Sequence, residues 1–405
     1  MSIRHWVWLS GVTNASPKAR AALCAYYGGA EQAFHAPAGD YRKVPGLTEN
    51  EAALFETREL AAADRILADC EREGIDIVPL QDARYPDRLK NIFAPPVVLY
   101  VKGRLPDVDG VPSAAVIGTR QATPYGLKMG RDIAFEIVKC GGIVVSGLTE
   151  GVDRAAARGC LLAGGTCIGV LGTCHGGGGE LSRDVAASGA LVSEYPPGTP
   201  PLRRFFRERN RISSGLSHAV CVVEAPEQSG CLLFVREALE QGREIFAVPG
   251  NADAANSAGT IALLKQGARP AACGWDVMED FAAVYPDRIH RPGTVILPDG
   301  GPDAAQKPDA KARPAAENPR ETTKKEIDKE NTAGYIDWKE QLAGLNAEQL
   351  QIISAIGRGE THIDDIIETT NLSAAKVLSQ LTILEIKGYV RRAAGRRIVL
   401  NLKKK

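Results

Sequence analysis

The spacing of hydrophobic residues changes along the chain, and one spacing covers residues 1–80. Apolar residues recur there every three or four positions, as in "KARAALCAYYGGAEQAF", which predicts amphipathic helices. Between two of them, "VPGLTENEA" offers a turn and then Thr48 and Glu51 at the spacing of a capping box. A Pro-Gly turn between short helices fits a plain helical bundle or a helix-hairpin-helix contact to DNA. We therefore expect a helical domain over 1–80.

A second hydrophobic pattern covers residues 81–285, where short apolar runs are separated by helix-length segments. The continuous apolarity of these runs is typical of strands that are covered on both faces. It predicts an α/β fold with a Rossmann-like, doubly wound, mostly parallel sheet. The expected strands are "VVLYV" (97–101), "AAVIG" (114–118), "IVVSG" (143–147), "CIGVL" (167–171), "ALVSE" (190–194), "AVCVVEA" (219–225) and "EIFAV" (244–248).

The last part of the chain falls into two segments. Residues 286–340 are rich in Pro, Ala, Lys and Glu and carry few large apolar residues, which predicts a disordered linker. Residues 341–405 are expected to form three short helices and then two strands around a basic turn, the order of a winged helix. "SAAKVLSQLTILEIKG" takes the place of its recognition helix, and such a module either reads DNA or docks on a protein.

Composition limits the kinds of partner. Lys+Arg and Asp+Glu both number 49, so attraction to nucleic acid must come from local patches. The 9 cysteines show no metal-ligand spacing, which indicates reduced thiols and a cytoplasmic protein without a metal or cofactor. No apolar run is long enough to cross a bilayer, and we expect no membrane association.

One local patch of cations and aromatic rings stands out at "FFRERNRISSG", residues 205–215. Guanidinium groups that bind phosphates, interleaved with aromatic faces on which bases stack, are what single-stranded nucleic acid binding requires. The candidate residues are Arg203, Arg204, Phe205, Phe206, Arg207, Arg209 and Arg211. In the alternative interpretation the phenylalanines are core residues, and some arginines pair with acids such as Glu194 and Glu224.

Turns at the carboxyl ends of the predicted strands are further candidates, since an open α/β sheet binds its ligand there. "VIGTRQATPYG" places Gly118, Thr119 and Arg120 between a strand and a helix start, a combination suited to a phosphate. In "VVSGLTEGVD", Ser146 and Gly147 end a strand, and Asp153 is expected to cap or bond turn amides. "VLGTCHGGGGELS" is expected to be a flexible loop. No hydrolase or nucleotide-triphosphate motif is present, so we expect no enzyme activity.

Six motifs in chain order resemble the bacterial DNA-processing protein A (DprA, or Smf) family. They are "VIGTRQATPYG", "VVSGLTEGVD", "LVSEYPPGTPP", "RERNRISSGLS", "CVVEAPEQSG" and "GREIFAVPG". The resemblance implies a core that dimerises, binds single-stranded DNA and hands it to the RecA recombinase, so that incoming DNA is protected in natural transformation and recombination. The helical front and the winged-helix tail also resemble accessory domains of that family.

The resemblance also implies DNA-binding roles for particular residues. They are Arg120, Ser146, Gly147, Arg203, Arg204, Phe206, Arg209, Asn210 and Arg211, with Gly118 and Thr119 forming the phosphate turn. The chain departs from the family pattern at Arg207, where a proline is usual, and at Ala157, where a histidine is usual. Such departures line the crevice of the sheet and put a small-molecule role there in doubt.

Two other functions remain as alternatives. The chain could be an α/β nucleotide-processing enzyme of the phosphoribohydrolase type, but "VPGNADAANSAGT" does not reproduce that family's P-G-G-x-G-T-x-x-E turn. It could also be a transcription factor that acts through its winged helix alone. That alternative predicts sequence-specific binding to duplex DNA that survives deletion of residues 95–285.

Overall fold

The structure, a computed structural model, describes two main stretches of the chain. These are residues 2–37, 39–173 and 179–293, and in the C-terminal part 345, 347–356, 361–370, 372, 374–387, 389–393 and 397–400. The chain divides into two compact units, Met1–Gln306 and Lys307–Lys405. Most of the predicted linker, and the Gly-rich stretch at 174–178, lie outside the described residues. The boundaries proposed at 80, 285 and 340 stay predictions.

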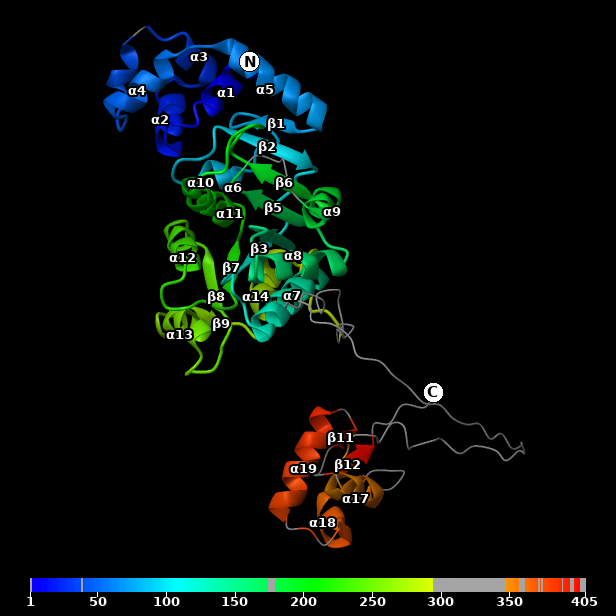
Figure 1. The fold of residues 1–405 in the computed structure, drawn as a ribbon. Coiled ribbons are helices and arrows are strands. Elements are labelled where there is room, and N and C mark those ends of the chain that lie inside the picture. The colour runs from blue at the N-terminus through cyan, green and yellow to red at the C-terminus, as the bar shows by residue number, and fades with distance from the viewer. Residues whose placement is uncertain are drawn as a thin grey trace, which may run out of the picture. The chain divides into compact units, whose positions relative to one another are not determined.

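Within the described residues, a nine-stranded sheet forms the centre of the first unit (Figure 1). Its strand order is β1-β2-β6-β5-β4-β3-β7-β8-β9. Strands β3 to β9 pair in parallel with their neighbours, whereas β2 pairs antiparallel with both β1 and β6. The strands are β1 (Asp76–Pro79), β2 (Val98–Gly103), β3 (Ser113–Ile117), β4 (Ile143–Ser146), β5 (Cys167–Leu171), β6 (Ala190–Ser193), β7 (Ala219–Val222), β8 (Glu244–Ala247) and β9 (Arg269–Pro270). The expected mostly parallel Rossmann-like sheet is confirmed.

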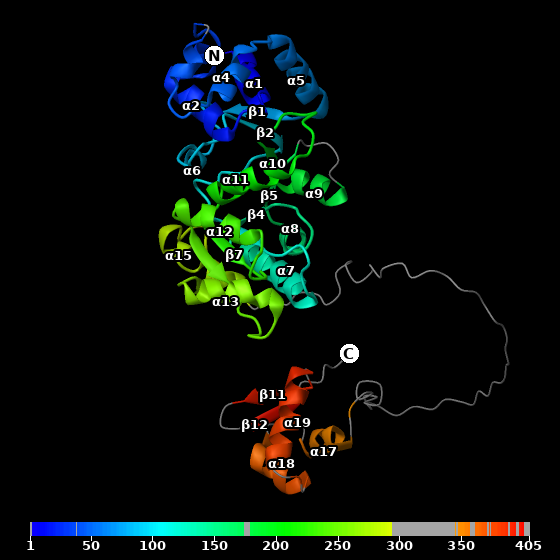
Figure 2. The ribbon, with the colours of Figure 1, turned by 60° about the vertical axis from the view of Figure 1, so that its left-hand side comes forward.

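Helices cover both faces of this sheet, which explains the continuous apolar runs (Figure 2). Ala114 and Val116 of β3 belong to the apolar cluster under α7, α8, α9 and α14, whereas Ala115 and Ile117 belong to the cluster under α11, α12 and α13. Neighbouring residues of one strand are thus buried on opposite sides. The helices are α6 (Asp87–Lys90), α7 (Pro124–Lys139), α8 (Val152–Leu162), α9 (Glu180–Ser188), α10 (Arg203–Glu208), α11 (Asn210–Gly215), α12 (Cys231–Glu240), α13 (Ala258–Lys265), α14 (Gly274–Met278) and α15 (Phe281–Val284).

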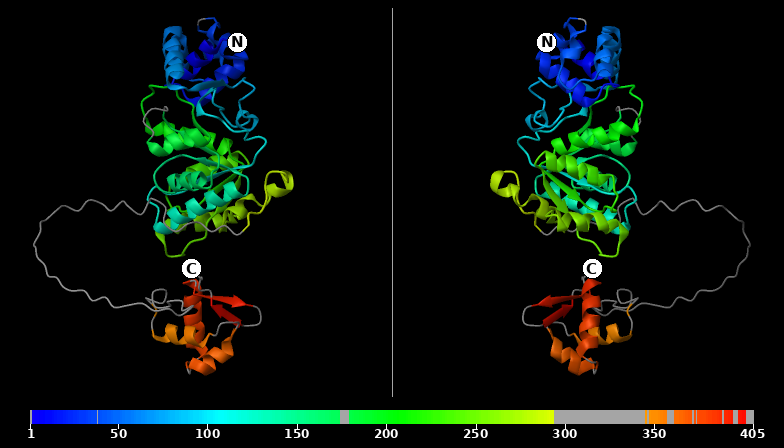
Figure 3. Two further views of the ribbon diagram at one scale, coloured as in Figure 1. Left: turned by 90° about the vertical axis from the view of Figure 1, so that its right-hand side faces the viewer. Right: turned by 90° about the vertical axis from the view of Figure 1, so that its left-hand side faces the viewer.

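The N-terminal helices pack at one end of the sheet, beside β1 and β2 (Figure 3). Their apolar cluster includes Trp6 and Leu9 and extends onto Val98 and Tyr100 of β2. They are α1 (Ile3–Gly11), α2 (Pro17–Tyr27), α3 (Ala30–Phe34), α4 (Glu49–Glu56) and α5 (Leu60–Glu73). The capping box of Thr48 and Glu51 is present.

The helical expectation for residues 1–80 is wrong at its end, because Asp76–Pro79 forms β1. This short segment pairs with β2 in antiparallel register. Such a tertiary contact cannot be predicted from a pattern of four residues.

The chain reverses direction in the sheet between β3 and β7. It adds β4, β5 and β6 on one side of β3 and then returns to add β7, β8 and β9 on the other. Such a reversal is where open α/β sheets bind ligands, at the carboxyl ends of the strands. The turns after β3, β4, β5 and β7 therefore meet at one edge of the sheet.

The second unit has the predicted winged-helix order. Its described elements are α17 (Ala347–Ala355), β10 (Thr361–His362), α18 (Ile363–Thr370), α19 (Ala374–Ile386), β11 (Val390–Ala393) and β12 (Arg397–Leu400). The strands pair as β10-β12-β11, and Ile352, Val377 and Leu381 belong to its apolar cluster. Residues 394–396 of the expected basic turn lie outside the described residues.

Two further findings concern the described residues only. None of their helices combines the length and the apolarity that crossing a membrane requires. They also hold no group of three or more His, Cys, Asp or Glu side chains arranged to hold a metal ion.

Candidate nucleic-acid interface

The turn after β3 is fastened to the start of α8. Thr119 donates its backbone N–H to the carbonyl of Glu224 at 2.8 Å, and its own carbonyl accepts from the N–H of Val152 at 3.3 Å. Gly151 has φ +86°, and a Cβ there would collide with the carbonyls of Thr119 and Arg120, so the close approach of the two turns requires glycine. Arg120 is exposed beside this junction.

The turn after β4 is closed by its own polar side chains. Ser146 is buried, donates its hydroxyl to the carbonyl of Asp153 at 2.8 Å and accepts from the N–H of Leu148 at 3.1 Å. Asp153 accepts from the hydroxyl of Thr149 at 2.9 Å, and a backbone hydrogen bond from Gly118 also stabilises its ionised form. Asp153 therefore bonds neighbouring turn groups, as predicted.

Arg209 reaches this turn from the junction of α10 and α11. It is only 6% exposed, and its Nη1 donates to the carbonyl of Val170 at the end of β5, at 2.8 Å. A Cβ on Gly147 would collide with its guanidinium, so the glycine provides the space that Arg209 occupies. Among the described residues, Nε of Arg209 has no hydrogen-bond partner.

Two guanidiniums act electrostatically on one carboxylate at this edge. Burial lowers the pKa of Arg209, Asp153 opposes that shift, and the positive charge of Arg120 lowers the pKa further. Burial raises the pKa of Asp153, against the opposing effects of Arg209, Thr149, Gly118 and Arg120. Beside Asp153 the two cations outnumber the carboxylate, which favours a bound phosphate. The neighbouring Glu224 carboxylate is engaged by Thr123 at the start of α7.

Phe206 lies next to this charge. Its side chain is half-buried and packs on Gly172, where a Cβ would lie 3.0 Å from both its Cα and its Cδ1. Because Gly172 directly follows β5, the ring sits over the same edge of the sheet as Arg209. The half-exposed ring is available for stacking.

The remaining predicted side chains lie on α10 or directly after it. Arg203, Arg204 and Arg207 are exposed on α10. Arg204 also donates to the carbonyl of Thr13 at 3.2 Å and to Oδ1 of Asn14 at 3.3 Å. Asn210 is half-buried, and its carbonyl accepts from Ser214.

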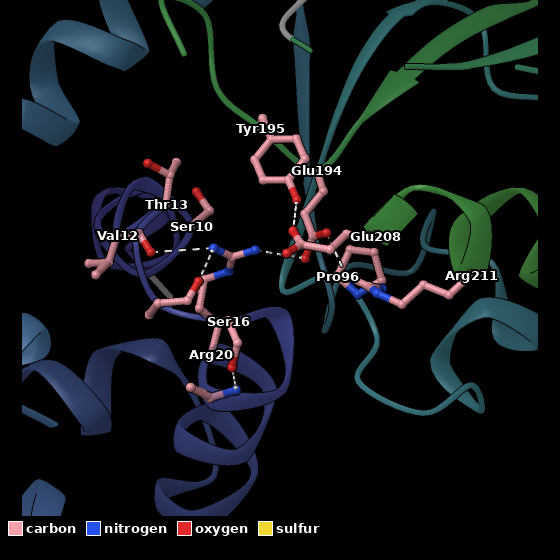
Figure 4. Close-up of polar contacts among 12 residues, drawn as sticks. Ser10, Val12, Thr13, Ser16, Arg20, Pro96, Glu194, Tyr195, Glu208 and Arg211 are labelled. Atoms are coloured by element: carbon pink, nitrogen blue, oxygen red, sulfur yellow. Dashed lines mark hydrogen bonds and ion pairs between the residues drawn. The ribbon is translucent and has the colours of Figure 1, made fainter. Parts of the chain in front are cut away.

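Arg211 and Phe205 point to the other side of the helical segment. Phe205 is 1% exposed and stacks on Tyr195, with 3.9 Å between ring centroids. Arg211 is 6% exposed, and its Nη2 donates to Oε2 of Glu194, which also accepts Arg20 through Oε1 (Figure 4). The two interpretations of "FFRERNRISSG" thus each describe one side of it, since Phe205 is core and Arg211 pairs with Glu194. Phosphate binding by Arg211 stays a prediction.

Glu224 does not pair with an arginine among the described contacts. Its carboxylate accepts from the N–H of Thr123 at 2.9 Å and from the hydroxyl of Thr123, whose hydroxyl in turn accepts from Gly126. Phosphate binding at this helix start stays a prediction, and the chain's own Glu224 carboxylate is bonded to Thr123 directly before α7. The sequence shows a helix start but not which distant residue fills it. Arg120 instead faces the start of α8.

Sequence reasoning missed Arg20 and the electrostatic interaction of Arg209 with Asp153. Arg20 sits on α2, 174 residues from Glu194, and no local pattern marks it. For Asp153 the signal was present in "GVDR", but the partner came from a distant helical segment.

Comparison with known proteins identifies the family of this chain. Residues 76–282 match the DNA recombination-mediator protein A family, and residues 339–396 match the DprA winged helix domain. The chain belongs to the DNA recombination-mediator protein A family. The core match spans the whole nine-stranded sheet, including the β3 and β4 turns and α10–α11.

Relatives of this family cover much of the chain. It is 37% identical to the DNA processing protein DprA of Bacillus subtilis over 227 residues, 54% of this chain and 75% of the relative. It is 30% identical to the protein Smf of Synechocystis over 344 residues, 82% of each chain. The crystal structure of DNA processing protein A from Streptococcus pneumoniae aligns with a TM-score of 0.60 at 29% identity, covering 68% of this chain and 97% of that one.

Proposed function

We propose that this protein binds single-stranded DNA along the carboxyl edge of its sheet. The observation that carries the proposal is the meeting of Arg120, Arg209 and Phe206 at that edge, with Asp153 as the carboxylate on which both guanidiniums act. Guanidiniums neutralise phosphates in any sequence, and an exposed ring face stacks on any base. Family membership and the exposed Arg203, Arg204 and Arg207 on α10 support the same function.

The direct test is fluorescence-anisotropy titration of a labelled single strand and of its duplex, at two salt concentrations. We expect tighter, salt-sensitive binding of the single strand. Arg120→Ala should weaken binding and reduce the salt slope by about one phosphate contact. Arg65→Ala removes an equally exposed arginine from α5 and should leave binding unchanged. Equal binding by both variants would contradict the proposed site.

RecA loading, protection of incoming DNA and a homodimer through the sheet-bearing core form the second part of the proposal. Family membership supports all of them, and Leu233 and Leu239 on α12 offer exposed apolar surface for a second copy. We expect the protein to accelerate RecA filament formation on strands coated with single-strand-binding protein. We also expect a dimer in analytical ultracentrifugation. Failure of either assay removes that part alone. The described cysteines are all free, which favours the reducing cytoplasm as its location.

We further propose that it acts as a binding protein without a cofactor, and not as a phosphoribohydrolase. Glu224 supports this, because its carboxylate already fills the helix start at the sheet reversal, where a nucleotide phosphate would bind. Incubation with nucleoside monophosphates should release no free base by chromatography. Base release would restore the enzyme alternative.

The winged helix remains open between duplex reading and protein docking. Lys376 and Lys387 are exposed on and just after α19. If the winged helix alone made the protein a transcription factor, changes at Arg120 would leave all DNA binding intact. We expect them to weaken it.

A further inference from the structure

The N-terminal helices send one arginine into the interior of the first unit. Arg20 on α2 is 1% exposed, and its Nη1 donates to the carbonyls of Ala15 at 3.0 Å and Val12 at 3.3 Å. Its Nη2 donates to Oε1 of Glu194 at 3.1 Å (Figure 4). One planar guanidinium thus holds both the loop before α2 and a carboxylate of the core.

The same carboxylate holds the DNA-binding segment. Glu194, which follows β6 and is 1% exposed, accepts Arg211 of α11 through its second oxygen at 2.5 Å. Arg20, Glu194 and Arg211 form a buried ionic triad that joins α2 to α11. Charge-assisted bonds to the two oxygens of one carboxylate restrict the positions of both guanidiniums.

Two aromatic residues make a second connection between the same parts of the chain. The guanidinium of Arg20 lies 5.9 Å from the ring of Tyr195, which stacks on Phe205 of α10. The hydroxyl of Tyr195 donates to Glu208, also on α10. With the bond from Arg204 to Thr13, the contacts toward the N-terminal helices extend along α10 and reach the first turn of α11 at Arg211.

The triad is a costly way to hold a core together. Two buried guanidiniums share one carboxylate, and apolar residues of similar volume stabilise an interior at least as well. What the ion triad provides is a defined geometry, because each guanidinium fork accepts few orientations. The geometry it defines is that of α10–α11, which presents Phe206 and Arg209 at the sheet edge.

We propose that Arg20 is a positioning residue for single-strand binding, and that the N-terminal helices orient the DNA-binding segment through the buried ionic triad. The inference rests on the proposed function. Arg20 touches no solvent-facing part of the interface, so it acts through Glu194 and Arg211 and not on the DNA.

Arg20→Gln in the full-length protein tests the proposal in two ways. We expect single-strand affinity to fall about tenfold, equal to about 1.4 kcal/mol, because Phe206 and Arg209 lose their fixed placement. The salt slope should match that of the wild type, since no phosphate contact is removed. Hydrogen exchange read by mass spectrometry should become faster over residues 203–215.

The matched control is Arg58→Gln. Arg58 also lies among the N-terminal helices, and its Nη1 donates to the carbonyls of Phe34 at 2.9 Å and Ala36 at 2.6 Å. Its loss should speed exchange only within the N-terminal helices and leave affinity unchanged. Arg20→Lys keeps the charge without the fork, and it carries the test if Arg20→Gln does not fold. It should bind more weakly than wild type at an equal salt slope.

Unchanged affinity together with unchanged exchange over 203–215 in the Arg20 variants would overturn the proposal. So would an equal loss of affinity in Arg58→Gln, because that would show a general effect of weakened helices. If wild-type protein does not bind single strands, the proposed function fails, and the exchange measurement still decides whether Arg20 orders α10–α11.

Discussion

The two sides of the segment from Arg203 to Gly215 carry the same residue types in different surroundings. On one side, which we call the anchor face, Phe205, Glu208 and Arg211 follow each other at intervals of three and bond Tyr195 or Glu194. On the other, the strand-end face, Phe206 and Arg209 have the same interval and lie over the ends of β4 and β5. The anchor face is directed at Tyr195 and Glu194, whereas the strand-end face places the half-buried Phe206 over the sheet edge. Among the described residues both arginines keep guanidinium nitrogens without a hydrogen-bond partner, Nε in Arg209 and Nε and Nη1 in Arg211.

This difference shows that composition alone does not tell a ligand-binding arginine from a structural one. Arg209 and Arg211 are equally buried at 6% exposure, yet Arg209 donates to Val170 at the end of β5 and Arg211 donates to Glu194. The carboxylate also differs, since Glu194 serves two guanidiniums through separate oxygens. Orientation on the helix assigns the roles.

The largest effect is expected from removing the charge at the centre of the anchor face. Glu194→Gln leaves Arg20 and Arg211 buried without their carboxylate, and the free energy of unfolding should fall by about 3–5 kcal/mol. Chemical denaturation measures it. Asp64→Asn, which breaks the exposed pair with Arg4, should leave stability unchanged. Similar losses in both variants would mean that burial of the triad has no special weight.

Next comes the adjacent pair of phenylalanines. Phe205→Ala should lower the free energy of unfolding by about 3–5 kcal/mol, because it opens a cavity against Tyr195. Phe206→Ala should keep most of the stability and instead weaken single-strand binding by about 1–3 kcal/mol, with an unchanged salt slope. Denaturation and anisotropy on both variants decide. If Phe205→Ala weakened DNA binding and Phe206→Ala lowered stability, the roles assigned to the two faces would be exchanged.

The two buried arginines give a smaller contrast in salt dependence. Arg209→Gln should reduce the salt slope of single-strand binding by about one, the loss of one phosphate contact. If Arg211 stays on Glu194 when DNA binds, Arg211→Gln should leave the slope as in the wild type. Anisotropy across a salt series is the measurement. A reduced slope in Arg211→Gln would show that Glu194 releases this arginine to DNA.

The smallest effect concerns pH at the strand-end face. Burial raises the pKa of Asp153 above its ordinary 3.8, so the folded protein takes up this proton at higher pH than the unfolded chain does. Between the ordinary and the raised pKa, stability contributed by this group therefore falls as pH rises. The neutral acid also leaves Arg120 and Arg209 without a counter-charge.

Single-strand affinity should accordingly increase as the pH falls through the raised pKa of Asp153. Asp153→Asn keeps an acceptor for Thr149 but removes the titrating group, and its pH profile should be flatter than that of the wild type. Anisotropy at matched ionic strength checks this. Parallel profiles for both proteins would assign the pH dependence to another group.

The layered core could be predicted from the sequence because strands buried on both faces leave continuous apolar runs, as in "AAVIG" and "AVCVVEA". Helix starts were also readable, since Thr123 before Pro124 caps α7 through Gly126. Seven expected strands correspond to β2 through β8. Local patterns do not show in which direction two strands pair. For this reason we did not expect β1, or the antiparallel pairing of β2 with β6.

The site could be predicted in outline but not in its pairings. Residues 203–211 and the turns at Gly118 and Gly147 were found because unusual chemistry is concentrated in short stretches. Their partners are separated by long stretches of chain: Glu224 from Thr123 by 101 residues, and Arg20 from Glu194 by 174. Only the tertiary fold shows which arginine an acid neutralises and which helix start it fills.

Photo-crosslinking of a single strand that carries 5-iodouracil, followed by peptide mapping, tests the central claim most directly. This base reacts with aromatic side chains on which it stacks. We predict a crosslink at Phe206, none at Phe205, and its loss when Arg120→Ala lowers occupancy. Efficient crosslinking confined to the winged helix or to the N-terminal helices, with Phe206 unmodified, would contradict the assignment of the strand-end face as the single-strand binding site.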